Sequence, residues 1–326
     1  MEKTKPSEDN RPGWGRGKFF KLFKVLLRVT VSVICLVYAL RGVDVAVLRN
    51  VFLKYSKINV AAVLFIFALC VWIQALRLSL LFDPGLGVLN ALKAVLVGLG
   101  FNNVLPAKGG EVVKVAYVSK FLNRPASTAT AAVFLERFLD ANCLYFLSIL
   151  VLGDMINQSV KWWAGAFFVI FWSLFVFFRV RHDVLLKIWG LFTLLGHVRY
   201  LDEPRIIPPQ RMSQRQILAA VVSTAGVWVT YFAYSASAFV VAGNFPISLE
   251  DAAVIFLVSA AGQLVPSSPG SLGVFEASIV WSAGVFGVER EQALGIAFLM
   301  RVIQFLPTAA AIVFMAGRRR EFREVA

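Results

Sequence analysis

Long apolar stretches alternate with short polar connections along most of the chain. A helix needs about 20 apolar residues to cross a hydrocarbon core of roughly 30 Å, and several stretches reach or approach that length. The pattern therefore predicts an all-α integral membrane protein with about six transmembrane helices. The predicted spans are 25–43, 59–82, 126–152, 162–179, 217–242 and 293–316.

Two further apolar regions, 88–122 and 249–288, are interrupted in the middle by proline and glycine. Proline removes a backbone donor and glycine permits tight turns, so neither region continues as one helix. Each arm has about 12 to 16 residues, or roughly 18–24 Å, which is too short to cross the membrane. We therefore predict two re-entrant helical hairpins that turn at 102–111 and 262–276. The predicted structural turn residues are Pro106, Gly109 and Gly110 in the first hairpin, and Pro266, Pro269, Gly270 and Gly273 in the second.

The two turns resemble each other at an offset of 160 residues. Leu105-Pro106 matches Val265-Pro266, each pair follows a polar amide, and each leads through glycines to a glutamate. Interrupted apolar segments in corresponding halves of a chain are typical of transporter binding sites. The pattern favours an inverted repeat, and a chance match of two proline- and glycine-rich loops is the alternative.

The predicted domain organisation follows this repeat. The chain divides into a basic N-terminal segment (1–24), a single transmembrane domain (25–317, with halves of roughly 25–198 and 216–317) and a basic tail (318–326). Segment 184–198 is short and amphipathic, which predicts an interfacial helix rather than a span. Segment 199–215 is the longest polar connection and separates the halves.

Composition excludes several classes of protein. Hydrophobic residues make up 59% of the chain and charged residues 16%, against roughly 45–50% and about 25% in soluble domains. A water-soluble globular protein is therefore excluded, and 29 Phe and 8 Trp exclude a disordered chain. The first apolar run ends without a small-residue cleavage site, so we interpret it as a retained span rather than a signal peptide.

The net charge of +14 lies mainly in short segments between apolar runs. There it sets membrane orientation, and we do not expect nucleic-acid binding. Both basic termini are predicted to lie in the cytoplasm, with the protein in the cell inner membrane. Segment 41–57 is the exception, because its four cations fall on the predicted external side.

Histidine and cysteine are too sparse for most catalytic or metal sites. The chain has two His, and its three cysteines lie in apolar runs without CxxC spacing. It also lacks phosphate-binding, hydrolase, zinc-protease and dinucleotide motifs. We therefore expect no cofactor, no metal and no enzymatic activity.

Charged residues inside apolar runs are the first candidates for a binding site. Glu136, Arg137 and Asp140 lie well inside the span 126–152, with Glu136 and Asp140 on one helical face. Arg137 either receives a lipid phosphate or belongs to a buried ion-pair cluster. Arg77, near the end of its span, is expected to reach the interface. Arg301 lies deeper and requires a partner.

Either Glu111 or Glu276, at the start of a hairpin's second arm, is the natural partner for Arg301. A carboxylate at that position also interacts favourably with the helix N-terminus, and this is the role we expect for each glutamate taken alone. The hairpin turns offer backbone N–H groups, to which Lys108 and Lys114 add positive charge, although a simple turn would use the same residues. The predicted lipid-headgroup site comprises Asn103, Lys108, Glu111, Glu136, Arg137, Asp140, Gln263, Ser267, Ser268, Glu276 and Arg301.

Several of these motifs together resemble a known family. They are Arg41-Gly-Val-Asp44, Arg77, Leu105-Pro106 with Gly109-Gly-Glu111, Glu136-Arg137 with Asp140, and Pro266-Ser-Ser-Pro-Gly-Ser-Leu-Gly273 with Glu276. The chain resembles the flippase-like transmembrane domain of lysylphosphatidylglycerol synthases, in a stand-alone form. The resemblance implies paired re-entrant hairpins that form a cavity for lipid headgroups, and movement of aminoacylated or glycosylated lipids between leaflets. Only about ten residues follow the last span, so lysyl transfer is not expected.

The leading hypothesis is a polytopic inner-membrane protein that binds an anionic, aminoacylated or glycosylated lipid headgroup and assists its translocation. The alternative is a non-catalytic subunit that supports a separately encoded lipid-, hopanoid- or polysaccharide-modifying enzyme. A transferase that uses Mg²⁺ on Glu136 and Asp140 ranks last, because Arg137 lies beside them.

Overall fold

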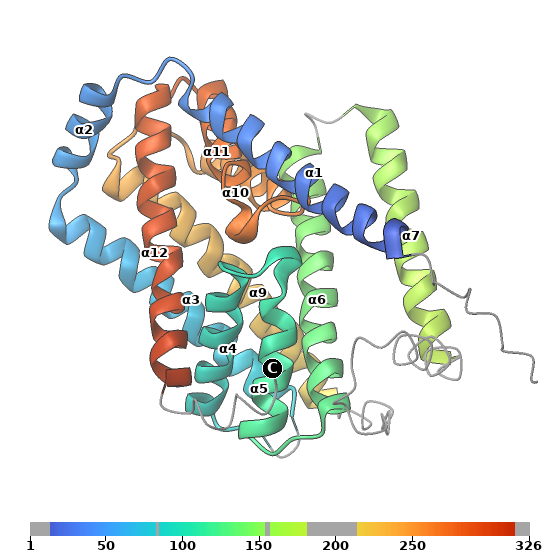
Figure 1. The fold of residues 1–326 in the computed structure, drawn as a ribbon. Coiled ribbons are helices and arrows are strands. Elements are labelled where there is room, and N and C mark those ends of the chain that lie inside the picture. The colour runs from blue at the N-terminus through green and yellow to red at the C-terminus, as the bar shows by residue number, and fades with distance from the viewer. Residues whose placement is uncertain (1–13, 83–84, 154–156, 181–213, 317–326) are drawn as a thin grey trace, which may run out of the picture.

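A computed structural model of the chain describes residues 14–82, 85–153, 157–180 and 214–316. Within these ranges all regular structure is helical (Figure 1). The basic tail, the predicted interfacial helix 184–198 and all but the last two residues of the predicted connection 199–215 lie outside the described residues. The α-helices are α1 (Trp14–Leu40), α2 (Val45–Lys54), α3 (Lys57–Leu80), α4 (Val88–Asn102), α5 (Gly110–Phe121), α6 (Ala126–Leu152), α7 (Gln158–Val180), α9 (Gln214–Ser237), α10 (Leu249–Gly262), α11 (Val274–Val285) and α12 (Arg290–Ala316).

Each of the six predicted spans falls on one of these helices. Within the part of the chain that the structure describes, three helices are long and apolar enough to cross a membrane: α3, α9 with its π-helical extension η2 (Ala238–Ala242), and α12. Helices α1 and α2, bent by 82° at the break between them, add a fourth if they form one span. Helix α6 has the length of a span but carries three charged residues in its interior. Three or four spans are thus supported, and the full set of six stays a prediction.

The first predicted span ends earlier than expected, because the chain turns sharply after Leu40. Gly42 adopts a positive φ of 73°, and Asp44 caps α2 by accepting hydrogen bonds from the amides of Ala46 and Val47. No residue of α2 is buried. The four cations of segment 41–57 are exposed on or beside this helix.

The first predicted hairpin is formed by α4 and α5, joined by a 3₁₀ turn, η1 (Pro106–Lys108). Glycine allows the two arms to pack at close range. A Cβ on Gly110 would lie 2.0 Å from the carbonyl oxygen of Gly98, so any larger residue would force the arms apart. The helical hairpin is therefore confirmed over 88–121, whereas its re-entry into a bilayer stays a prediction.

The second predicted hairpin is formed by α10 and α11, joined through a second 3₁₀ turn, η3 (Pro269–Ser271). A capping box between Ser248 and Asp251 starts α10. Gly273 starts α11 with a φ of +84°, and a Cβ there would lie 2.2 Å from the carbonyl oxygen of Ser32 on α1. Glycine is required at this position for both reasons.

The two hairpins point toward each other from opposite ends of the helical bundle, and their turns meet near its middle (Figure 1). At this contact the Cβ position of Gly270 lies 3.4 Å from the carbonyl oxygen of Asn103. The two hairpins are thus oppositely directed within the bundle, and their entry from opposite faces of a membrane stays a prediction.

The correspondence between the two turns differs in detail from the predicted offset. The amides Asn103 and Gln263 both follow the last residue of a first arm, which confirms the offset of 160 residues there. The 3₁₀ turns, however, begin at Pro106 and at Pro269, an offset of 163. Pro266 is therefore not the equivalent of Pro106, because the second turn holds three additional residues before its 3₁₀ segment.

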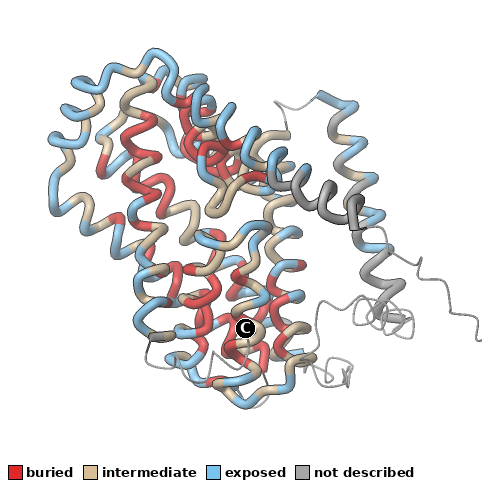
Figure 2. The backbone as a smooth tube through the Cα atoms, in the orientation of Figure 1, coloured by how far each residue is buried: buried red, intermediate tan, exposed pale blue. Residues whose placement is uncertain are grey.

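Buried residues are concentrated on α3, α4, α11 and α12, whereas α1, α2 and α7 are largely exposed where described (Figure 2). The exposed surface is apolar: Trp162 and Trp163 on α7 are 73% and 78% exposed. Lipid contact accounts for such a surface in a membrane protein, because acyl chains are as apolar as these side chains.

Candidate functional site

Arg77 lies at the centre of a buried charge cluster that joins α3 to α6. Its Nη1 and Nη2 atoms donate to the two carboxylate oxygens of Asp140 at 2.6 and 3.3 Å. Its Nε lies 3.4 Å from Glu136. The side chain is 1% exposed, so the prediction that Arg77 reaches the interface is wrong. The last turns of α3 are covered by α6 and α9, and this guanidinium faces protein instead of headgroups.

Lys114 connects the first hairpin to the same cluster. Its ammonium lies 2.7 Å from Glu136 and 2.9 Å from Glu111, one turn earlier on α5. Lys114 and Glu136 are both almost completely buried. Asn102, at the end of α4, donates to the second oxygen of Glu111 at 3.2 Å. The cluster thereby ties both arms of the hairpin to α6.

Arg137 is the most exposed of the three cations that contact the carboxylates of the cluster. Its side chain is 43% exposed, and its contacts to Asp140 and Glu111 are long, at 3.3 and 3.9 Å. Lys108, exposed at the hairpin turn, lies within electrostatic range of Arg137, Glu111 and Asp140. The three cations Arg77, Lys114 and Arg137 balance three carboxylates, so Lys108 brings an excess of one positive charge.

Helix α9 completes the cluster with neutral donors and acceptors. Trp228 donates its indole N–H to Asp140 at 3.3 Å, and Thr224 accepts from Arg77 at 3.4 Å. Within the described residues, no group of three His, Cys, Asp or Glu side chains is arranged to hold a metal ion. Asp140 and Glu136 instead face the guanidinium of Arg77, a cation that disfavours a bound Mg²⁺ at the same oxygens.

Arg301 on α12 organises the turn of the second hairpin. Its Nε lies 2.7 Å from Glu276, Nη1 donates to the carbonyl of Gly270, and Nη2 donates to that of Ser271 at 3.4 Å. Its guanidinium also lies over the ring of Phe275, 4.6 Å from the centroid. Of the two candidate partners, Glu276 is confirmed. Glu276 also accepts from the amide of Gly273 at 2.7 Å, so it fills the predicted N-terminal role at the same time.

The polar residues of the two turns bind neighbouring helices. Asn103 donates to the carbonyl of Gln304 and to the hydroxyl of Thr308 on α12, at 2.8 and 3.0 Å. The amide of Ser268 donates to the hydroxyl of Ser32 on α1 at 2.8 Å. Helix α12 therefore contacts the turns of both hairpins. Its Arg301 binds the turn of the second hairpin. About one helical turn later, its Gln304 and Thr308 accept hydrogen bonds from Asn103 in the turn of the first hairpin.

The predicted site residues thus separate into two groups. The first, at the charge cluster, comprises Lys108, Glu111, Glu136, Arg137 and Asp140; the second, at the other turn, comprises Glu276 and Arg301, with Ser267, Ser268 and Gln263 nearby. The remaining predicted residue, Asn103, belongs to neither group and binds α12. Sequence reasoning missed Arg77, Trp228 and the burial of Lys114 as parts of the first group. The i,i+3 spacing of Glu111 and Lys114 in the largely apolar first part of this arm was an available signal.

Comparison with known proteins identified one family. The model described as "Lysylphosphatidylglycerol synthase TM region" matches residues 25–311, which is most of the chain. The match spans both hairpins and both groups of charged residues. No curated protein and no solved structure gave a significant match.

Proposed function

The chain belongs to the family of the lysylphosphatidylglycerol synthase transmembrane region, and from this premise we propose that it binds a lipid headgroup between its two hairpins. In this proposal the protein assists movement of that lipid between the leaflets of the cell inner membrane. The headgroup is anionic, or is an aminoacylated or glycosylated group joined to the lipid through a phosphate.

The exposure of Arg137 is the observation that carries the proposal. Its two partners, Asp140 and Glu111, are 16% and 18% exposed, whereas this guanidinium is 43% exposed and held by long contacts. A guanidinium binds a phosphate with two parallel hydrogen bonds. Because Lys108 brings the local charge to one positive unit, a phosphodiester with one negative charge would neutralise the site.

The paired hairpins support the second half of the proposal. Turns of irregular backbone are tolerated at membrane depth only where protein or a wet cavity satisfies their polar groups. Here Arg301 satisfies carbonyls in one turn and Asn103 bridges the other turn to α12. The two turns meet in the middle of the bundle. In this proposal they offer a headgroup polar contacts halfway between the two ends of the protein.

Lipid transfer in proteoliposomes tests the proposal. The purified full-length chain is reconstituted with fluorescent phosphatidylglycerol, and the fraction of probe that an external quencher reaches is followed with time. We expect Arg137→Gln to slow transfer about tenfold or more, since a charge-assisted hydrogen bond contributes about 1.5–3 kcal/mol. The control is Lys120→Gln, an exposed cation at the end of the first hairpin away from its turn, which should keep the wild-type rate.

Two results would overturn the assignment. If Arg137→Gln transferred lipid at the wild-type rate, Arg137 would not bind the headgroup. If the wild-type protein moved neither phosphatidylglycerol nor its aminoacylated form, translocation by this chain alone would be excluded. A membrane subunit that supports a separate lipid-modifying enzyme would then be the better description.

A further inference from the structure

Helix α2 packs one face against the start of α12, and its opposite face is exposed in the part of the chain that the structure describes (Figures 1 and 2). The ring of Phe52 stacks on that of Phe298, with 6.5 Å between the centroids. A Cβ on Gly295 would lie 2.7 Å from Cγ1 of Val51, so glycine is what allows the two helices to approach this closely. The contacts of α2 run from Glu291 to Phe298, which is about 10 Å along α12.

Long apolar and basic side chains occur together on the exposed face of α2 and at the start of α3. Val45, Arg49 and Leu53 recur at every fourth position, so they lie on one helical face. Val45 and Leu53 are 77% and 70% exposed, and Ile58 is 75% exposed. We define the α2–α3 surface as six residues, all of them exposed: Val45, Arg49, Leu53, Lys54, Lys57 and Ile58.

The three cations of the α2–α3 surface have no acidic partner among the described residues. Arg49, Lys54 and Lys57 form no ion pair there. The acids at this end of the bundle lie instead in or just before the first turns of α2, α10 and α12, where a helix N-terminus favours a carboxylate. They are Asp44, Glu250, Asp251, Glu289 and Glu291. The surface therefore carries three positive charges without a counter-charge in contact.

The position of α2 along α12 corresponds to the border between headgroups and acyl chains. Helix α12 has 27 residues and is about 40 Å long, close to the thickness of a bilayer with its headgroups, about 40–45 Å. Its first 5–8 Å, roughly, then lie in the headgroup layer. The contacts of α2 lie about 1.5 to 12 Å from the first residue of α12, so they cross that border. Lysine and arginine at this depth extend their charges toward the phosphates.

We infer that the α2–α3 surface binds the phosphates of anionic lipids in the leaflet at this end of the bundle. Arg49, Lys54 and Lys57 supply the charge, while the three apolar side chains contact the acyl chains. Basic clusters beside a membrane select anionic lipids in this way, by about a factor of five for each cation. Helix α2 is then a lipid-binding segment at the membrane surface and not the second half of a span with α1. The basic residues of segment 41–57 thus have a role other than setting membrane orientation.

Fluorescence quenching by spin-labelled lipids tests the inference at α2 itself. A fluorophore is attached to Asn50→Cys, an exposed position on α2, in the full-length protein with its three native cysteines replaced by alanine. The protein is reconstituted in vesicles of phosphatidylcholine and phosphatidylglycerol, in which one lipid or the other carries a nitroxide. We expect phosphatidylglycerol beside the fluorophore to be enriched about fivefold or more over its share of the vesicle lipid.

Two sets of substitutions on the surface separate charge from shape. Arg49→Gln with Lys54→Gln and Lys57→Gln removes the three charges and should reduce the enrichment to about twofold or less. Arg49→Lys with Lys54→Arg and Lys57→Arg keeps the charges and should keep the enrichment. All of these side chains are exposed, so neither set disturbs the packing of α2 on α12.

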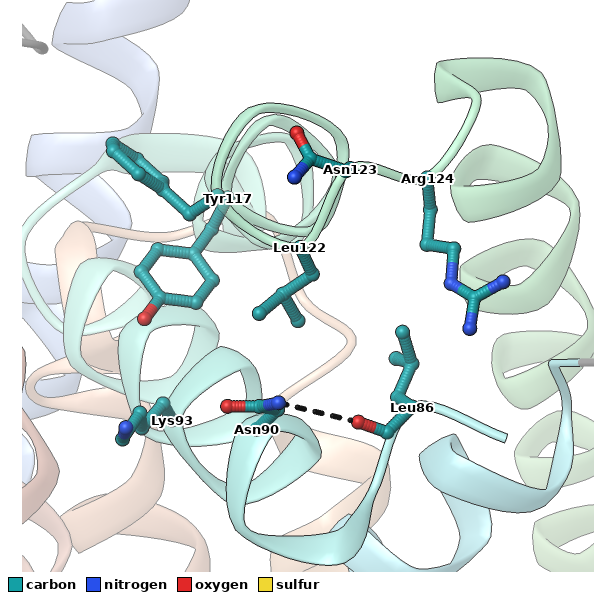
Figure 3. Close-up of a pocket in the computed structure, with 8 residues that line it drawn as sticks. Leu86, Asn90, Lys93, Tyr117, Leu122, Asn123 and Arg124 are labelled. Carbon is teal, nitrogen blue, oxygen red and sulfur yellow. Dashed lines mark hydrogen bonds between the residues drawn. The ribbon is translucent and has the colours of Figure 1, made fainter. Parts of the chain in front are cut away.

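The matched control removes three exposed cations at the opposite end of the bundle. One of them, Lys93, lines a polar pocket of about 330 Å³ at that end (Figure 3). The others lie near the end of α5 and at the start of α9. The control variant is Lys93→Gln with Lys120→Gln and Arg215→Gln. It loses the same total charge as the glutamine variant of the surface, and it should keep the wild-type enrichment at α2.

Each outcome decides the inference. Equal enrichment in the wild type and the glutamine variant of the surface overturns it. An equal loss in the control also overturns it, because the effect would then come from overall charge. If neither spin-labelled lipid quenched the fluorophore, α2 would be covered by a second copy of the chain or would face water, and the inference would again be wrong. Lipid transfer is not measured here and no residue of the charge cluster takes part, so the proposed function stands or fails separately.

Discussion

Removing the charge of Glu136 should destabilise the protein more than any other substitution in the charge cluster. Glu136 is 1% exposed, and its carboxylate lies 2.7 Å from Lys114 and 3.4 Å from Arg77. At an effective dielectric constant of about 20, such separations correspond to attractions of about 6 and 5 kcal/mol. They offset the cost of burying three charges, so Glu136→Gln leaves two buried cations competing for the remaining carboxylates. The expected loss in free energy of unfolding is about 3–5 kcal/mol.

A double-mutant cycle separates the interaction energy of Glu136 and Lys114 from a general loss of stability. Lys114→Met alone leaves an excess carboxylate and should also destabilise by several kcal/mol. Glu136→Gln combined with Lys114→Met restores the balance among the ion-paired side chains, with two cations (Arg77 and Arg137) and two carboxylates (Glu111 and Asp140). The double variant should therefore be more stable than the sum of the single effects predicts, by at least about 1.5 kcal/mol.

Equilibrium unfolding of the purified protein in mixed micelles, followed by tryptophan fluorescence, measures these free energies. The reasoning is refuted if Glu136→Gln lies within about 0.5 kcal/mol of wild type, or if the two single effects add. Additivity would mean that the two side chains do not interact in the folded protein, contrary to their 2.7 Å separation.

Three further predictions concern the hairpin turns. Gly273→Ala should lower the thermal midpoint by several degrees, because its φ is +84° and the new Cβ would lie 2.2 Å from the carbonyl oxygen of Ser32; Gly284→Ala on the same helix has nothing within 4 Å and should be neutral or stabilising by up to about 1 kcal/mol. Arg301→Lys should speed hydrogen exchange of amides 266–273 about tenfold, because one ammonium cannot replace three guanidinium contacts; unchanged exchange would show that Arg301 does not hold this turn. Asn103→Leu removes two hydrogen bonds donated to α12 and should reduce the free energy of unfolding by about 1–3 kcal/mol, with no loss expected if the turns do not pack against that helix.

The sequence predicted the helices and both hairpins well because hydrophobic length and proline–glycine breaks are local signals. Pro106 and Gly110 mark the first break directly, and the structure places the turn there. The offset between the two turns was less accurate, since it depended on matching Pro106 with one of two nearby prolines. Pro266 and Pro269 are chemically identical, and only backbone conformation distinguishes the one that starts the 3₁₀ turn.

The contacts of the charged residues were harder to predict, because they depend on how deeply each side chain is buried and on which other helices pack against it. Arg77 lies three residues before the end of α3, and this position alone favours a side chain that reaches the interface. Its burial follows from α6 and α9 packing over that end, with Asp140 supplied from 63 residues away. The pairing of Arg301 with Glu276 was one of two predicted alternatives, and tertiary structure decided between them.

The sequence separation of Arg77 and Asp140 also has a consequence for how the protein is made. Ribosomes add roughly 5–20 residues per second, so the 63 residues between them take about 3–13 s to synthesise. During that interval α3 holds a positive charge whose counter-ion has not yet been translated. We therefore expect nascent α3 to stay beside the insertion machinery, with the Arg77 guanidinium hydrated or bound there, until α6 is made and Asp140 neutralises this charge.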